Sequence, residues 1–130
     1  MSLTVPADLL DTAQRGEVSD EEFIDCIRTS LPYAWAVVSQ VASDLKSGGG
    51  DFTDHQTPPP SDVERGQLLR ALASDAIRGA LQRHFGLTLA FQNCHRVAAF
   101  RHDAVGTDRH RAFTSARAQL LNQSPELRNC

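Results

Sequence analysis

The chain has little of several residue types that mark common protein classes. Its 130 residues include a single Lys, a single Trp, a single Tyr and three cysteines, at positions 26, 94 and 130. An odd number of widely spaced cysteines does not make a disulfide framework. A membrane-spanning helix needs about 18 consecutive apolar residues, and no apolar run in the chain approaches that length. The first residues lack the basic and apolar regions of a secretory signal. We therefore expect a cytoplasmic protein.

Sequence motifs for common catalytic chemistry are absent as well. No Gly-x-Ser-x-Gly elbow holds a nucleophilic serine. The glycines at 48–50 are not followed by the Lys-Ser/Thr of a phosphate-binding loop, and no Cys-x-x-Cys pair accompanies the histidines. The sequence therefore predicts no resident metal or cofactor, and a function that is not enzymatic.

The charge of the chain is divided at a Gly- and Pro-rich stretch, residues 47–60. Residues 1–65 carry 12 acidic and 4 basic side chains, whereas residues 66–130 carry 9 arginines and 4 acids. Opposite charge on two halves indicates either that they pack face to face or that each meets a different partner.

The apolar pattern predicts one domain, all-α or mainly α, of four to five helices. Capping signals precede two of them, because Ser19 and Ser61 are each followed three residues later by glutamate. The longest helix is expected over residues 61–85 and would form the centre of the fold, with Gly86 ending it. Further helices are predicted at 8–14, 19–31, 32–46 and 107–122.

Two segments and the C-terminal tail are not covered by these predicted helices. Residues 47–60 are expected to form an irregular loop, because they contain three glycines and three prolines. Residues 87–100 fit either a short β-hairpin or one more buried helix, and the pattern leaves both open. The tail at 124–130 is expected to be frayed.

The polar run between the two apolar parts of 87–100 is the best candidate site. It reads Gln92-Asn93-Cys94-His95-Arg96. Cysteine and histidine are ligands that zinc selects, and a Cys–His pair is also a candidate nucleophile and base. Neither interpretation has a matching motif, and the simpler interpretation is that Cys94 is a small buried apolar residue and His95 a partly exposed polar one.

Arginines gather on the polar face of the expected last helix. Arg109, Arg111 and Arg117 lie there, and with Arg96 they could form a basic surface of the kind that binds phosphate. The overall pI of about 5.9 and the single lysine argue against nucleic acid as the partner. Arginines on a solvated helix face are the simpler interpretation.

Four stretches of the sequence carry a resemblance to a protein family. These are Ser-Leu-Pro-Tyr-Ala-Trp at 30–35, Thr-Pro-Pro-Pro at 57–60, the helical run at 72–81 and Phe-Gln-Asn-Cys-His-Arg at 91–96. Together with the Arg- and Ala-rich composition they resemble small hypothetical proteins of actinobacteria such as Streptomyces. The resemblance implies a bacterial cytoplasmic protein with an accessory or regulatory role, and no catalytic residues come with it.

By elimination, the sequence predicts a regulatory or adaptor protein that acts through protein–protein contacts, as a homodimer or with a separate protein. The expected contact surface combines the last helix with residues 92–96. Two other classes stay open. One is a small-ligand or metal-binding protein or enzyme that uses the Cys94–His95 region, and the other binds nucleic acid through the Arg-rich half.

Overall fold

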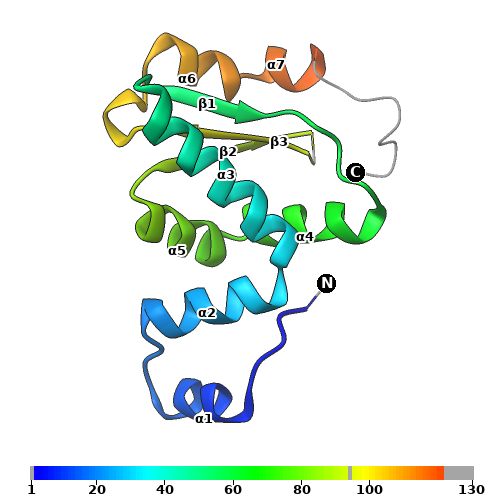
Figure 1. The fold of residues 1–130 in the computed structure, drawn as a ribbon, viewed down its shortest axis with the longest axis vertical. Helices are drawn as coiled ribbons and strands as arrows, with labels where there is room; N and C mark the ends of the chain where they lie inside the picture. Colours follow the sequence, from blue (N-terminus) through cyan, green and yellow to red (C-terminus); the bar gives the residue numbers. More distant parts are fainter. Residues whose placement is uncertain (1, 94, 122–130) are drawn as a thin grey trace.

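The computed structural model describes residues 2–93 and 95–121, which form helices around a small sheet (Figure 1). The helices are α1 (Ala7–Arg15), α2 (Asp20–Ser30), α3 (Pro32–Gly48), α4 (Asp62–Leu72), α5 (Asp75–Phe85), α6 (Asp108–Phe113) and α7 (Ala116–Leu121). The strands are β1 (Phe52–His55), β2 (Thr88–Gln92) and β3 (Arg96–Phe100), and a single 3₁₀ turn lies at His102–Ala104. The described part of the chain is therefore mainly α, as the sequence predicts.

The three strands form an antiparallel sheet in the order β1-β3-β2, with helices on both faces (Figure 1). Side chains alternate along β3, so its two faces belong to different clusters. Val97 and Ala99 pack into the main core with α2 to α5. Ala98 and Phe100 face the opposite way and pack with Phe113 of α6. The sheet thus separates a large core from a small one beneath α6.

Helix α3 lies at the centre of the larger core. Six of its residues are buried, and Val38 and Val41 are completely inaccessible. Its first turn has no capping side chain of its own. Instead, Oε1 of the buried Gln67 on α4 accepts the backbone N–H groups of Tyr33 at 2.7 Å and Ala34 at 3.3 Å. A side chain distant in sequence therefore satisfies the open N–H groups of this helix.

Local capping chemistry explains several element boundaries. Ser19 and Glu22 form the reciprocal capping box that the sequence predicts for α2. Ser61 caps α4 by accepting the Val63 N–H at 3.2 Å. Gly86 ends α5 in the left-handed conformation, with φ 68°, which glycine adopts without steric cost.

The prediction of one long central helix over 61–85 is wrong. The chain forms α4 and α5 instead, separated by Ala73 and Ser74. The Ser74 hydroxyl accepts the Ile77 N–H at 3.3 Å and starts a new helix. The apolar spacing continues through the break because both helices bury their apolar residues in the same core.

The prediction of an irregular loop over 47–60 is wrong for six of its residues, because α3 continues through residues 47 and 48 and four further residues form a strand. Phe52–His55 form β1, which pairs with β3 in the register Phe52↔Phe100 to His55↔Val97. Of the two alternatives for 87–100, the hairpin is confirmed, since β2 and β3 pair in antiparallel fashion from Thr88↔Phe100 to Gln92↔Arg96. Hairpin formation supplies the central strand on which β1 docks.

The single last helix predicted for 107–122 is also wrong, because the chain forms the two short helices α6 and α7. Thr114 and Ser115 lie between them, and the Ser115 hydroxyl accepts the Ala118 N–H at 3.1 Å. The predicted frayed tail at 124–130 lies outside the described residues. None of the helices described is both long and apolar enough to span a membrane.

Candidate partner-binding groove

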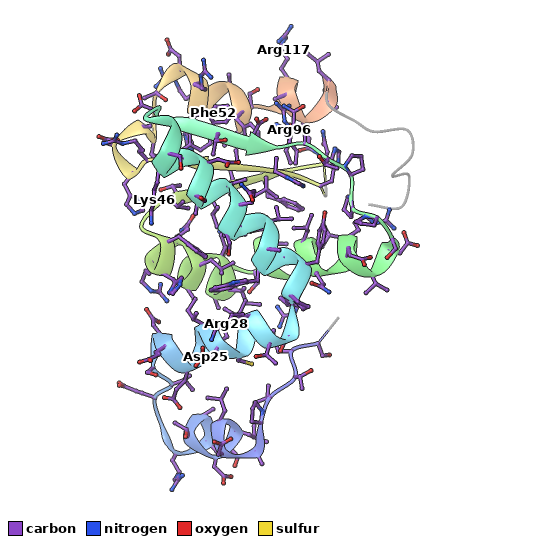
Figure 2. The ribbon with its side chains drawn as sticks, viewed as in Figure 1. Asp25, Arg28, Lys46, Phe52, Arg96 and Arg117 are labelled. Carbon is purple, nitrogen blue, oxygen red and sulfur yellow. The ribbon has the colours of Figure 1, made fainter. Side chains whose placement is uncertain are left out.

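A groove of about 310 Å³ runs between the sheet and the α6–α7 pair. All three strands and the two helices contribute to its walls, and Figure 2 shows Phe52, Arg96 and Arg117 at this end of the molecule. We call it the arginine groove. Its lining residues are Phe52, Gln92, Arg96, Arg109, Ala112, Phe113, Arg117, Ala118 and Leu121.

Arg96 is held in place by neighbours on the sheet. Its Nη2 and Nε donate to Oδ2 of Asp54 on β1, at 3.0 and 3.2 Å, and its Nη1 donates to Oε1 of Gln92 at 3.3 Å. Both partners of the ion pair are about four-fifths buried. Gln92 in turn donates from Nε2 to the Phe113 carbonyl at 2.5 Å. This network connects the hairpin to α6 and fixes the direction of the Arg96 guanidinium.

Two phenylalanine rings support two of the arginines. The Arg96 guanidinium lies 5.2 Å from the ring centroid of Phe113, and that of Arg109 lies 5.2 Å from the centroid of Phe52. Such contacts stabilise a cation over the negative face of the ring. The rings are themselves packed on Phe100, at 5.0 Å for Phe52 and 6.0 Å for Phe113. The small core therefore forms a rigid base for the positive charges.

The arginine groove has an excess of positive charge. Among the described residues that line it there is no carboxylate. Arg96 has its partner Asp54, whereas Arg109 and Arg117 form no ion pair within the described part of the chain. Leu121 adds an apolar edge that is 64% exposed. The arrangement can bind an anionic group that also carries apolar surface.

The structure brings together four of the eight residues that sequence analysis selects, namely Gln92, Arg96, Arg109 and Arg117. Arg111 does not line the groove, and instead pairs with Asp108. Asn93 and His95 are buried in the hairpin turn, where His95 Nδ1 contacts the Asn93 carbonyl oxygen at 2.7 Å. Cys94 lies outside the described residues.

The sequence does not indicate that Phe52, Asp54 and Phe113 support a site. Phe113 lies in the segment predicted to form the last helix, and no role in a site is predicted for it. Phe52 and Asp54 belong to the stretch expected to be irregular, although Phe52-Thr53 is a β-favouring pair flanked by polar residues. That signal is short and does not indicate which strand would pair with it.

The histidines and cysteines do not form a metal site in the described part of the chain. No group of three or more His, Cys, Asp or Glu side chains lies close enough together there to hold an ion. His102 contacts the Thr88 hydroxyl at 2.9 Å, and His110 accepts the Gly106 N–H at 3.2 Å. These histidines therefore have separate local partners.

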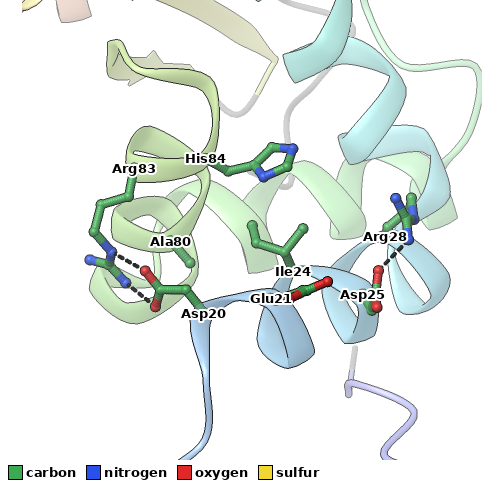
Figure 3. Close-up of a pocket in the computed structure, with 8 residues that line it drawn as sticks. All are labelled: Asp20, Glu21, Ile24, Asp25, Arg28, Ala80, Arg83 and His84. Atoms are coloured by element: carbon green, nitrogen blue, oxygen red, sulfur yellow. Dashed lines mark hydrogen bonds and ion pairs between the residues drawn. The ribbon is translucent and has the colours of Figure 1, made fainter.

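A second hollow of about 560 Å³ lies between α2 and α5 (Figure 3). Arg83 on α5 donates from Nε and Nη2 to the two carboxylate oxygens of Asp20 on α2, at 2.7 and 3.0 Å. Figure 3 shows this pair at one side and the Asp25–Arg28 pair at the other. The hydrogen bonds from Arg83 lower the pKa of the Asp20 carboxyl below its ordinary value of 3.8. The Asp20–Arg83 pair connects α2 to α5, whereas the Asp25–Arg28 pair lies within α2.

Replacing Asp20→Asn is expected to lower the thermal unfolding midpoint slightly at neutral pH and to have no effect in strong acid. A carboxyl whose pKa is lower in the folded protein than in the unfolded chain stabilises the fold at pH values above its ordinary pKa. This stabilisation is lost as the pH falls through the pKa of the folded protein. Circular dichroism melts at pH 7 and at about pH 2 measure the difference. Asp75→Asn is the control, because its Arg78 partner lies on the same helix. An equal effect at both pH values would contradict the assignment.

Comparison with known protein families gives one match. A family model described as NucS shadow ORF matches the chain over residues 1–130. The chain belongs to the NucS shadow ORF family. No curated protein and no solved structure matches it. The arginine groove is thus a feature of a member of the NucS shadow ORF family.

Proposed function

We propose that the chain is a non-enzymatic regulatory or adaptor protein that binds an acidic segment of a protein partner in the arginine groove. The observation that carries the proposal is the convergence of Arg96, Arg109 and Arg117 from three different elements on one groove. Arginine is suited to this role because its planar guanidinium binds carboxylates with two hydrogen bonds.

Apolar surface at the edge of the groove favours a protein segment. Leu120 and Leu121 on α7 are 75% and 64% exposed. Protein interfaces combine apolar anchors with arginine. An acidic segment that also carries leucine or valine side chains would match both features of the groove.

Nucleic acid is the second candidate, and the name of the family model supports it through the element KH. KH domains hold four nucleotides against a Gly-x-x-Gly loop. No Gly-x-x-Gly occurs anywhere in this sequence. In addition, Arg109 already covers a face of Phe52, which removes that face as a stacking platform for a base. Both observations favour the protein partner.

The proposal is tested with two fluorescent probes, a peptide of alternating glutamate and leucine residues and a single-stranded RNA of the same net charge. We expect the peptide to bind and the double variant Arg109→Glu, Arg117→Glu to bind it at least about tenfold more weakly, since two cations become anions. Fluorescence anisotropy measures both affinities. The variant is expected to remain folded, because both side chains are exposed.

The double variant Arg15→Glu, Lys46→Glu is the matched control. It changes the net charge equally at two exposed positions that do not line the groove, so peptide binding should be retained. Equal weakening by both double variants would show that only net charge matters and would overturn the proposal. Binding of the RNA without the peptide would favour the nucleic-acid candidate instead.

The origin and compartment of the chain belong to this proposal as well. We propose an actinobacterial source, which the ratio of 12 arginines to one lysine supports. A cytoplasmic location is supported by the free, buried thiol of Cys26, since reduced cysteines are typical of that compartment.

A further inference from the structure

Acidic and basic surfaces lie at opposite ends of the long axis of the described chain. Helices α1 and α2 form one end, and α6 and α7 form the other (Figure 1). Seven carboxylates and two arginines occur in residues 7–30, at Asp8, Asp11, Arg15, Glu17, Asp20, Glu21, Glu22, Asp25 and Arg28. The two halves of the chain are joined by the ion pairs Asp20–Arg83 and Asp54–Arg96, but α1 lies far from the α6–α7 pair (Figure 1).

Part of the acidic end already has local partners. Asp20 and Asp25 are in ion pairs, and Glu22 belongs to the capping box of α2. For Asp8 and Asp11 on α1, no ion pair with a described residue is present. Both side chains are exposed, so α1 offers a cluster of carboxylates that an arginine surface can bind.

Helix α1 also presents apolar side chains. None of its residues is buried. Leu10 is 49% exposed, and Val5 just before the helix is 45% exposed. An amphipathic helix normally buries its apolar face, so this helix has apolar surface left for a partner. Its combination of leucine with two aspartates is the composition that fits the arginine groove and the exposed leucines of α7.

We infer that the acidic segment bound in the arginine groove belongs to a second copy of this chain, whose α1 docks on α6 and α7. The inference depends on the proposed function, because it uses the same groove. Within one molecule the two ends lie apart (Figure 1), so the contact forms between molecules. Two chains aligned antiparallel would make the contact twice and close as a dimer, whereas a head-to-tail arrangement would make longer chains.

The test uses complementary charge reversal. One double variant, Asp8→Lys with Asp11→Lys, removes both carboxylates of α1 and makes this helix basic, and the other, Arg109→Glu with Arg117→Glu, makes the groove acidic. Analytical ultracentrifugation with a reducing agent keeps disulfide formation out of the measurement. We expect the unchanged chain to associate, and its average mass to fall as salt rises from roughly 50 to 500 mM, because salt screens exposed charges.

Each double variant alone is expected to be a monomer, since its α1 and its arginine groove then carry charge of the same sign. An equimolar mixture of the two should associate again, because every junction between unlike variants pairs opposite charges. The control is Asp44→Lys with Asp62→Lys, which reverses two exposed aspartates outside α1 and the groove and should associate like the unchanged chain.

The outcomes separate this inference from the proposed function. A chain that stays monomeric at low salt but binds the glutamate–leucine peptide would overturn the inference and leave the groove as a site for a foreign partner. Failure of both experiments would overturn both. Association that is insensitive to the Asp8 and Asp11 changes would also overturn the inference, because it would place the contact elsewhere.

Discussion

Replacing Phe100→Ala is expected to lower the free energy of unfolding by about 3–5 kcal/mol, the usual cost of removing a fully buried phenylalanine. Phe100 is inaccessible to solvent. Its ring contacts Phe52 and Phe113, and His110 meets it edge-on with centroids 4.9 Å apart. Removal leaves a cavity beneath α6 that these neighbours cannot all fill. Chemical denaturation followed by circular dichroism measures the loss.

The matched control is Leu120→Ala, which removes a large apolar side chain that is 75% exposed. It should change the free energy of unfolding by less than about 0.5 kcal/mol. A loss below about 1 kcal/mol for Phe100→Ala would contradict the packing of the small core. The Phe100→Ala variant should also weaken binding of the glutamate–leucine peptide, because the two rings that support Arg96 and Arg109 pack on Phe100.

Replacing Gln67→Leu is expected to lower the free energy of unfolding by about 1–3 kcal/mol, the cost of buried polar groups left without a partner. The side chain keeps its approximate size but loses the oxygen that accepts the N–H groups of Tyr33 and Ala34. Because Pro32 begins α3 and Leu31 supplies no capping side chain, nothing local replaces that acceptor. Denaturation curves measure the loss, and faster amide exchange at Tyr33 and Ala34 would locate it.

Gln40→Leu provides the same chemical change at an exposed position of α3. Within the described part of the chain, its side-chain amide donates a hydrogen bond to Asp44 alone, at 2.8 Å, so the free energy of unfolding should change by less than about 0.5 kcal/mol. If the two glutamine variants were equally stable, the cap from α4 would not contribute to the fold.

Local signals in the sequence predict the elements whose ends are set by neighbouring residues. The capping box at Ser19 and the glycine at 86 are confirmed because a cap needs only a few residues of context. The break at Ser74 carries a similar signal, a serine followed by aspartate. The apolar spacing hides it, since α4 and α5 bury the same kind of face in one core.

Elements that depend on distant partners are harder to predict. Strand β1 has only four residues and forms because β3 is available later in the chain, as the pairing of Asp54 with Ala98, 44 residues away, illustrates. Its flanking glycines and prolines favour a loop when read alone. The fold class therefore follows from the sequence, whereas the three-stranded sheet requires the tertiary structure.

The arginine groove likewise combines residues that the sequence indicates with an arrangement that requires the tertiary structure. Residue type and helix face identify Arg96, Arg109 and Arg117 as candidates from sequence. Their convergence depends on the break between α6 and α7, where Ser115 supplies a local cap, and on the packing of these helices against the sheet, which is not encoded locally. The rings of Phe52 and Phe113 contact Arg109 and Arg96 because of this tertiary arrangement.

The outer strand β1 also has a consequence for the behaviour of the chain at high concentration. An open sheet edge invites the addition of a strand from another molecule, which leads to aggregation. This edge is only four residues long, carries Asp54, and is followed by prolines at 58–60. Short length, charge and proline each discourage strand addition. We therefore expect β1 to resist amyloid-type polymerisation, so that concentrated solutions of the protein remain clear.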